Sequence, residues 1–457
     1  MKKILYSVVL LLTTLLTHAQ TKSITGETAA QKAKRLEWWT EDRFGLFIHW
    51  GLYALPARHE WIKKREHIST EDYQRYFDHF DPTEYNPKEW AKKAKAAGMK
   101  YAVLTAKHHE GFCLFDSKFT EYKSTNTPAK RDLLREYVDA FRAEGIKIGI
   151  YYSLIDWHHP DFTIDKNHPQ HFQGDEKKDS KAAAKYYHTV NKGKDMNRYR
   201  QYMKNQITEL LSNYGKIDII WPDYSYPGEF GKGHQDWDAI GLVKLIKTLQ
   251  PDILIDNRLD LPDYTDGWDF ETPEQVSIAQ LKQYRGRYWE TCQTFSGSWG
   301  YFRDEDAHPW KSQRELLSLL INSVANGGNL ILNVGPTGKG EFDYRANNAL
   351  DSMAYWMHAN KKSIYACTFA PPIYRVPEAL DISQTYNPKT KTLYLHLFTY
   401  PTDGKLVLPG YADKVSYIQF LHDISEIKYT VDGDNLVLML PKQKPLFEVP
   451  VIEIFLK

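Results

Sequence analysis

Side chains suited to acid–base chemistry and sugar recognition stand at the ends of apolar runs along this chain. They are His49 and Trp50, His108 and His109, Tyr151 and Tyr152, Asp223, Arg258, Glu290, and Asn333. The carboxyl ends of parallel strands in a βα barrel open onto one mouth, where active sites are built. Each residue alone has an ordinary explanation, such as a core histidine or an aspartate that caps a loop. Their repetition favours one shared functional site.

Asp223 is the carboxylate in the least expected surroundings. In 217-IDIIWPDYSYPGEF-230, an apolar run breaks at Pro222 and places Asp223 among Trp221, Tyr224 and Tyr226. Glycoside hydrolysis with retention needs one ionised carboxylate as nucleophile and one protonated carboxyl as acid. An aromatic surround suits the oxocarbenium-like transition state of this reaction. The pattern therefore favours a glycosidase.

Two other chemistries compete with this interpretation. A metal-dependent hydrolase would use His108 and His109, but adjacent strand residues point to opposite faces and the chain has neither HxH nor HExxH. A non-catalytic sugar-binding module would also use aromatic, histidine, arginine and glutamate side chains. It would not require carboxylates at the strand ends. We therefore expect no metal and no cofactor.

Seven apolar runs predict strands that are buried on both faces. They are 45-GLFIHWG-51, 100-KYAVLTAKH-108, 147-KIGIYYS-153, 217-IDIIWPD-223, 252-DILIDNR-258, 286-GRYWETC-292 and 328-GNLILNVG-335. Amphipathic helices are predicted between them, for example over 87–97, 133–144 and 199–214, each followed by a glycine. Repeated βα units favour a (β/α)8-like barrel over residues 30–365. A doubly wound open sheet is the alternative, although no GxGxxG follows any strand.

Two further regions have their own character. The polar, lysine-rich segment from Asp156 to Asp195 is predicted to be a surface loop near the mouth of the site, on the side of the leaving group. After about residue 365, apolar residues alternate with a period of two, and Asp432-Gly433 marks a turn. This pattern predicts a C-terminal antiparallel β-sandwich domain over 366–457.

Composition narrows the class of protein. The chain has 457 residues and a formal net charge of +1, which gives no case for a nucleic-acid or membrane-surface partner. Residues 1–19 have the form of a signal peptide, with Lys2 and Lys3 before an apolar stretch and a cleavage site after Ala19. We expect an exported protein, periplasmic or secreted. The three cysteines lack metal-ligand spacing and are expected to be buried thiols. The sequence does not indicate whether the protein is a monomer or an oligomer.

Eight ordered motifs resemble those of the α-L-fucosidases of glycoside hydrolase family 29. They are 44-FGLFIHWG-51, 60-EW-61, 107-KHHEGF-112, 149-GIYYS-153, 255-IDNR-258, 289-WETC-292, 297-GSWGY-301 and 327-GGNLILNVGPTGKG-340. They run from about residue 35 to 365, and the sandwich is similar to the usual second domain of that family. The resemblance implies hydrolysis of α-L-fucosides with retention, through a covalent fucosyl-enzyme intermediate and without a metal.

The resemblance also implies roles for particular residues. The nucleophile would be Asp223, although the family pattern resembles Trp-Phe-Asp and this chain has Pro222 before the aspartate. Further residues would form the fucose pocket: His49, Glu60, Trp61, His108, His109, Tyr151 and Arg258, with Trp299 on the side of the sugar's methyl group. The substrate would be a fucosylated glycan or glycoside.

The general acid is the open assignment. The loop 267-GWDFETPEQ-275 offers Glu274 and Glu271, and the motif resemblance favours Glu274. Glu290 is a third candidate, which could instead be structural. A retaining mechanism predicts a separation of about 5–5.5 Å between the two carboxyl groups. The competing class is a fucose-binding protein of the same fold without catalysis.

Overall fold

The computed structural model describes residues 22–304 and 310–457. The predicted signal peptide, residues 1–19, lies outside the described residues. Within the two described ranges, no helix combines the length and the apolar character needed to cross a membrane.

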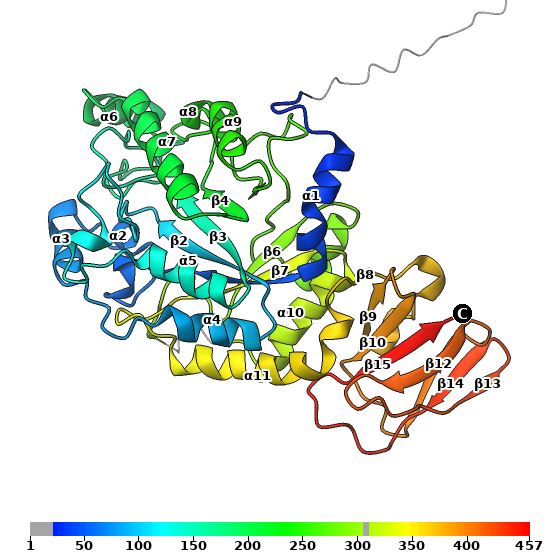
Figure 1. Ribbon diagram of the computed structural model, residues 1–457. Coiled ribbons are helices and arrows are strands. Elements are labelled where there is room, and N and C mark those ends of the chain that lie inside the picture. The colour runs from blue at the N-terminus through cyan, green and yellow to red at the C-terminus, as the bar shows by residue number, and fades with distance from the viewer. Residues whose placement is uncertain (1–21, 305–309) are drawn as a thin grey trace, which may run out of the picture.

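The larger, N-terminal domain is built on one parallel sheet of seven strands (Figure 1). In chain order the strands are β1 (Phe44–Ile48), β2 (Tyr101–Lys107), β3 (Lys147–Ser153), β4 (Ile219–Asp223), β5 (Leu254–Ile255), β6 (Glu290–Thr294) and β7 (Asn329–Val334). Their order in the sheet is β5-β4-β3-β2-β1-β7-β6. Each lies within or overlaps one of the seven predicted runs, so the prediction of the strands is confirmed.

The sheet curls into a barrel, and the alternative of an open sheet is wrong. Inward side chains of all seven strands or their immediate ends meet in one cluster, with Phe47, Val103, Tyr151 and Trp221 among them. Trp39 of helix α1 (Ala29–Asp42) packs in the same cluster and is buried. The interior is therefore a packed core, as in other βα barrels.

Segment 269–275 bridges the gap between the sheet's two edge strands, β5 and β6. On one side Asp269 N donates to Ile255 O at 2.7 Å. On the other side Glu290 N donates to Glu271 O at 2.8 Å, and Gln275 N donates to Cys292 O at 3.0 Å. This irregular eighth segment was not predicted as a strand, and it carries both candidate acids, Glu271 and Glu274.

Helices cover the outside of the sheet (Figure 1). The longer ones are α4 (Pro87–Ala96), α5 (Leu133–Ala143), α6 (Ser180–Val190), α7 (Met196–Asn213), α9 (Ala239–Leu249), α10 (Gln313–Ala325) and α11 (Tyr344–Asn360); the shorter ones are α2 (Ile62–Arg65), α3 (Thr70–Asp78) and α8 (His234–Trp237). The predicted capping residues Asn86 and Asp132 accept hydrogen bonds from Glu89 N and Arg135 N. These caps satisfy backbone donors that an isolated helix start leaves unpaired.

The segment from Asp156 to Asp195 is more ordered than the predicted surface loop. It contains α6, whose buried Ala183 and Tyr187 pack in a small cluster with Ile164 and Phe230. The segment reaches the loop after β4 through Asp165, which accepts a hydrogen bond of 2.6 Å from Tyr226. The sequence did not indicate this local core because the segment is mostly polar and only a few apolar residues form the core.

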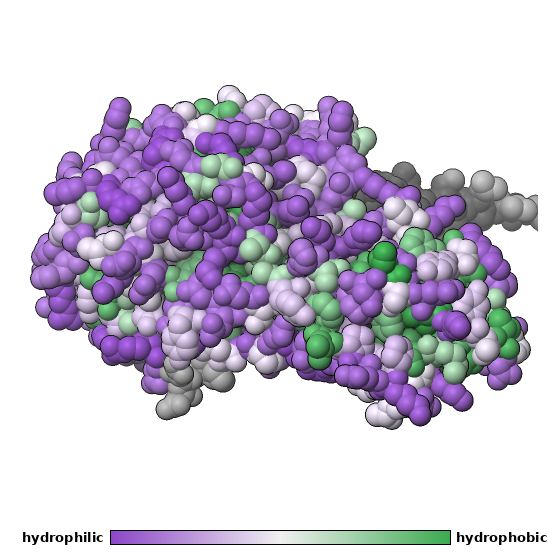
Figure 2. Space-filling model, turned by 60° about the horizontal axis from the view of Figure 1, so that its bottom comes forward, coloured by the Kyte–Doolittle hydropathy of each residue, from purple (hydrophilic) through white to green (hydrophobic). Residues whose placement is uncertain are grey.

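The C-terminal domain is the predicted antiparallel sandwich. One sheet has the order β12-β15-β10-β9-β8, and the other has the order β11-β14-β13. The strands are β8 (Thr368–Phe369), β9 (Ile382–Asn387), β10 (Thr392–Leu397), β11 (Lys405–Leu408), β12 (Val415–Phe420), β13 (Tyr429–Asp432), β14 (Asn435–Met439) and β15 (Val451–Leu456). Leu393, Leu395, Leu436 and Leu438 lie in the core between the sheets. Figure 2 shows apolar side chains on the outside of this domain, and the exposed ones include Val407 and Met439.

The two domains contact each other through specific hydrogen bonds. Trp356 of α11 donates its indole N–H to Val449 O at 2.8 Å, and Ser383 of β9 donates to Asn322 Oδ1 at 2.7 Å. The sandwich therefore rests on α10 and α11, away from the carboxyl ends of the barrel strands.

Candidate active site

The carboxyl ends of the barrel strands converge on one small pocket. His49, His108, His109, Tyr151, Asp223 and Arg258 come from the ends of β1 to β5, or from the residues just after them, and Glu60, Trp61, Glu274 and Trp299 come from loops. Every residue predicted to bind the sugar lines this pocket, as do Asp223 and Glu274. Glu271 and Glu290 do not line it.

Asp223 is the last residue of β4 and is 7% exposed. Its Oδ1 accepts from Arg258 Nη1 at 2.9 Å, and its Oδ2 accepts from the Tyr151 hydroxyl at 2.7 Å. These two hydrogen bonds fix the orientation of the Asp223 carboxyl group, as a nucleophile requires.

The backbone around Asp223 accommodates the unusual Pro222. Strand β5 pairs with β4 only at Ile219 and Ile220, so at Pro222 the sheet has a ladder partner on the β3 side alone. Proline is tolerated at such an edge because no second partner needs its missing N–H. Directly after Asp223, Tyr224 has a φ of 85°, which is uncommon for a residue with a side chain. The strand ends there, and the Tyr224 ring turns toward Trp61 and His109.

Arg258 joins the two candidate catalytic carboxylates. Its Nη1 pairs with Asp223, and its Nη2 donates to Glu274 Oε2 at 2.8 Å. Its Nε donates to Thr272 Oγ1 at 2.9 Å, and its guanidinium lies 4.5 Å from the Trp221 ring centroid. The negative charges of Asp223 and Glu274 raise the pKa of Arg258 despite burial, so its charge is permanent.

Glu274 and Glu271 lie on different sides of the closing segment. Glu274 reaches the pocket and is 43% exposed, whereas Glu271 pairs with Arg287 Nη1 at 2.8 Å, away from the pocket. Residues three apart on an extended segment point to opposite faces. The geometry therefore brings only Glu274 to Asp223.

Glu290 lies at the wrong end of its strand for catalysis. The prediction placed it near the carboxyl end, but β6 begins at Glu290, opposite the first residue of β7, Asn329. Glu290 is fully buried inside the barrel, where it accepts a hydrogen bond from the Tyr101 hydroxyl. Burial raises its pKa to about 8. It is a neutral structural carboxyl below that pH.

Replacing this buried acid should change the pH dependence of stability. The folded pKa of Glu290 lies above its unfolded value, so its stabilising contribution is full below the unfolded pKa and is lost as pH rises toward about 8. Glu290→Gln cannot ionise. We expect the midpoint of thermal unfolding of the variant to rise by about 2 °C or more relative to wild type between about pH 5 and pH 8. A difference between the two unfolding midpoints that stays constant from about pH 5 to pH 8 would contradict this account.

His49 and His109 present hydrogen-bond acceptors to the pocket. Asn333 Nδ2 donates to Trp299 O at 2.7 Å, so its Oδ1 must accept from His49 Nδ1, 2.6 Å away. Ser153 likewise donates to Ile155 O, so its Oγ accepts from His109 Nδ1 at 2.7 Å. Burial lowers the pKa of both imidazoles well below the usual value. The neutral rings therefore keep Nε2 as an acceptor for sugar hydroxyls.

His108 and His109 face the same pocket, contrary to the prediction for adjacent strand residues. Strand β2 ends at Lys107, so the alternation of a regular strand no longer applies, and the two ring centroids are 4.0 Å apart. Burial lowers the pKa of His108 to about 3, although the charge of Asp223 opposes this shift. Among residues 22–304 and 310–457, no group of three or more histidine, cysteine, aspartate or glutamate residues has the arrangement of a metal site.

Loops after β1 and β6 supply the remaining wall. Glu60 is buried, its Oε2 accepts from Gly300 N at 2.9 Å, and burial raises its pKa to about 7. Trp61 packs edge-on against His109, with the ring centroids 5.0 Å apart, and the ring centroids of Trp299 and His49 are 5.2 Å apart. The pocket thus combines hydroxyl-binding groups with apolar ring faces, as a deoxy sugar requires.

Four further residues line the pocket that were not predicted to do so: Phe47, Trp221, Tyr224 and Cys292. Phe47 and His49 are two residues apart, and this spacing places both on the inner face of β1. Trp221 and Tyr224 had been noted only as the surroundings of Asp223. Cys292 is a buried free thiol, as expected for all three cysteines. Period-two counting back from the strand ends would have found Phe47 and Trp221.

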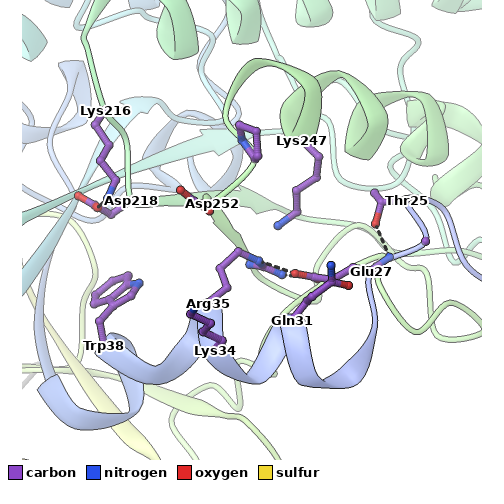
Figure 3. A pocket seen from close by; sticks show the side chains of 12 residues that line it. Thr25, Glu27, Gln31, Lys34, Arg35, Trp38, Lys216, Asp218, Lys247 and Asp252 are labelled. Carbon is purple, nitrogen blue, oxygen red and sulfur yellow. Dashed lines mark hydrogen bonds and ion pairs between the residues drawn. The ribbon is translucent and has the colours of Figure 1, made fainter.

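A larger hollow at the opposite end of the barrel lacks these features. It lies between α1 and the segments that lead into β4 and β5, and Figure 3 shows its charged lining. Arg35 is neutralised there by Glu27 and Asp269, each at 2.6 Å. Lys247 donates to Ile253 O at 2.6 Å. Because active sites of barrels form at the other end, size does not make this hollow the catalytic site.

A (β/α)8-like barrel whose mouth holds three acidic residues, neutral histidines and aromatic walls is the architecture of a glycoside hydrolase. The model of the family described as "Alpha-L-fucosidase" matches residues 11–362, and the chain belongs to this family. The human tissue α-L-fucosidase is 28% identical over 433 residues, which cover 89% of this chain and 85% of the human protein. The human plasma α-L-fucosidase is also 28% identical, over 394 residues, which cover 81% of this chain and 78% of that protein.

Solved structures agree with this assignment. α-L-Fucosidase isoenzyme 1 from Paenibacillus thiaminolyticus is 40% identical, with a TM-score of 0.79, and the match covers 93% of this chain and 99% of that chain. A family 29 α-L-fucosidase from Bacteroides thetaiotaomicron is 26% identical, with a TM-score of 0.77 and coverage of 93% and 96%. The latter structure is a trapped covalent intermediate with 2-fluoro-fucosyl fluoride. The resemblance found in the sequence is therefore confirmed.

Proposed function

We propose that this α-L-fucosidase removes terminal α-L-fucosyl residues from glycans or glycosides, with Asp223 as nucleophile and Glu274 as acid/base. The supporting observation is the Asp223–Arg258–Glu274 arrangement at the mouth of the barrel. It places two carboxylates on one guanidinium inside the pocket. Retention of configuration agrees with membership of a family in which a covalent intermediate has been trapped.

In the first step, an Asp223 oxygen attacks the anomeric carbon while the bond to the leaving oxygen breaks. Glu274 gives its proton to that oxygen. Glu274 uses Oε2 for Arg258, and its Oε1 has no hydrogen bond to any residue in the described ranges. Its partial exposure suits this role, because the leaving group must depart toward solvent.

In the second step, Glu274 takes a proton from water, and the resulting oxygen nucleophile attacks the anomeric carbon. The ester bond to Asp223 breaks and restores its carboxylate. Arg258 and Tyr151 then stabilise the returning charge. Two displacements on opposite faces of the sugar give a product of the original configuration.

Release of the aryl alcohol from an aryl α-L-fucoside tests the catalytic assignment against the non-catalytic alternative. We expect turnover by wild type and α-L-fucose as the first anomer seen by NMR. A protein that binds fucose without releasing the aryl alcohol would be the sugar-binding module. A β-anomer as first product would contradict the double displacement.

We expect activity to survive removal of metals. His49 and His109 each use Nδ1 within the protein, and the described residues contain no arrangement typical of a metal site. Dialysis against a chelator should therefore leave kcat/KM for an aryl α-L-fucoside within about twofold of the untreated value. Loss of activity that a divalent cation restores would support the metal-dependent alternative instead.

We also propose that the protein is exported, to the periplasm or outside the cell. The support is the sequence of residues 1–19, with two lysines before an apolar stretch and small residues before the cleavage site. N-terminal sequencing of the protein recovered from a secreting host is expected to begin at Gln20. Retention of Met1 in that material would contradict the proposal.

A further inference from the structure

A second hollow adjoins the fucose pocket on the side of Arg258. It has a volume of about 320 Å³ and is lined by Tyr224, Ser225, Asn257, Arg258 and Asp260. Tyr224 and Arg258 also line the fucose pocket, so the two spaces share a wall. The volume lies within the range of small-molecule sites, roughly 300–1,000 Å³.

Asn257 offers free donors to this hollow. Its Oδ1 accepts from Thr272 N at 3.1 Å and from Thr272 Oγ1 at 3.0 Å, and these bonds fix the orientation of the amide. Its Nδ2 donates to no residue in 22–304 or 310–457. An amide held in this way has two N–H groups left for a ligand.

Ser225 and Asp260 are anchored in the same manner. Ser225 Oγ accepts from the Trp237 indole N–H at 2.8 Å, which leaves its hydroxyl hydrogen available. Asp260 Oδ2 accepts from His234 N at 3.3 Å and lies 3.4 Å from His234 Nδ1. Its Oδ1 has no hydrogen bond within the described part of the chain. The hollow therefore carries preorganised donors and one acceptor.

We propose that this hollow is the subsite for the sugar to which the fucosyl residue is attached. The inference rests on the proposed function, since it places the leaving group beside Arg258, which donates a hydrogen bond to Glu274. Donors from Asn257 and Ser225 with an acceptor from Asp260 match a polyhydroxylated, uncharged ring. The Asp260 carboxylate disfavours an anionic sugar. Asn257, Ser225 and Asp260 thereby set the preference for a disaccharide over a simple fucoside.

The test compares two substrates that differ only in the leaving group. α-L-Fucosyl fluoride has no sugar to place in the hollow, whereas a neutral fucosyl disaccharide must occupy it. Ser225→Ala and Asp260→Asn are expected to lower kcat/KM for the disaccharide about 10-fold more than for the fluoride. Asp252→Asn, at the opposite end of the barrel, is the control and should leave the ratio of the two values unchanged.

The outcomes separate this inference from the function on which it rests. The subsite would be overturned if both variants lost kcat/KM equally on the two substrates, or lost it on neither. Wild-type protein that hydrolyses neither substrate would overturn the proposed function instead. Circular dichroism melts of both variants guard against a folding defect, and a second variant, Asp260→Ser, keeps the test open if Asp260→Asn melts early.

Discussion

Asp223→Ala is expected to lower kcat for an aryl α-L-fucoside by about 10⁴-fold or more, because the variant lacks the nucleophile. The small side chain cannot form the ester, and Arg258 and Tyr151 lose the carboxylate that they bind. The measurement is the steady-state release of the aryl alcohol. Added azide should restore part of the rate by attacking the anomeric carbon in place of Asp223. The product of that rescue is expected to be the inverted β-L-fucosyl azide.

The matched control for this prediction is Asp252→Ala. Asp252 precedes β5 at the far end of the barrel and lines the hollow of Figure 3. Its replacement should leave kcat within about twofold of wild type, as expected for a surface change. Full activity of Asp223→Ala, or an azide product with unchanged configuration, would remove Asp223 from the mechanism.

Glu274→Ala is expected to slow hydrolysis of a poor leaving group by about 10²–10⁴-fold, which is the usual contribution of general acid catalysis. α-L-Fucosyl fluoride needs less protonation of its leaving group, so its first step should be affected least. Glu271→Ala should stay within about threefold of wild type on both substrates, because Glu271 pairs with Arg287 outside the pocket. Rates for the two substrates with each variant form the measurement.

The two glutamates serve as controls for each other. Both lie on the segment that closes the barrel and both pair with an arginine. A larger loss in Glu271→Ala than in Glu274→Ala would reverse the assignment. Equal losses in both variants would indicate that the closing segment matters only for structure.

Much of this fold follows from the sequence because its strands are buried on both faces. Runs such as 100–108 and 147–153 contain continuous apolar stretches, 101–104 and 148–152, and β2 and β3 form around them. Strands of this kind are recognisable in the sequence because an apolar stretch of this length is typical of a strand that is buried on both faces. The curled sheet follows from repeated βα units. The sandwich follows from the change to period-two alternation.

The closing segment was not predictable as a strand for a physical reason. Residues 269–275 contain Pro273 and only one large buried apolar side chain, Phe270. The segment is ordered by hydrogen bonds to β5 and β6, which are distant in the sequence. The choice between Glu271 and Glu274 therefore required the structure, because the face of each residue depends on this pairing.

Strand boundaries limited two further site predictions. Glu290 was placed at the mouth because β6 was expected to begin four residues earlier, at Gly286, whereas it begins at Glu290. The His108–His109 pair was expected to diverge because β2 was extended beyond Lys107. When a strand boundary shifts by a few residues, a side chain moves to the other end of the strand or to the other face of the sheet. The local sequence does not determine where that boundary lies.

Covalent trapping tests the central claim most directly. The enzyme would be incubated with 2-fluoro-fucosyl fluoride, digested, and its labelled peptide sequenced by mass spectrometry. A fucosyl ester whose second step is slowed by the fluorine substituent should accumulate on Asp223. We predict one fluorofucosyl group per chain, attached to Asp223, and its absence in Asp223→Asn. A label on Glu274, or active enzyme that never gains a label and releases β-L-fucose first, would contradict the mechanism.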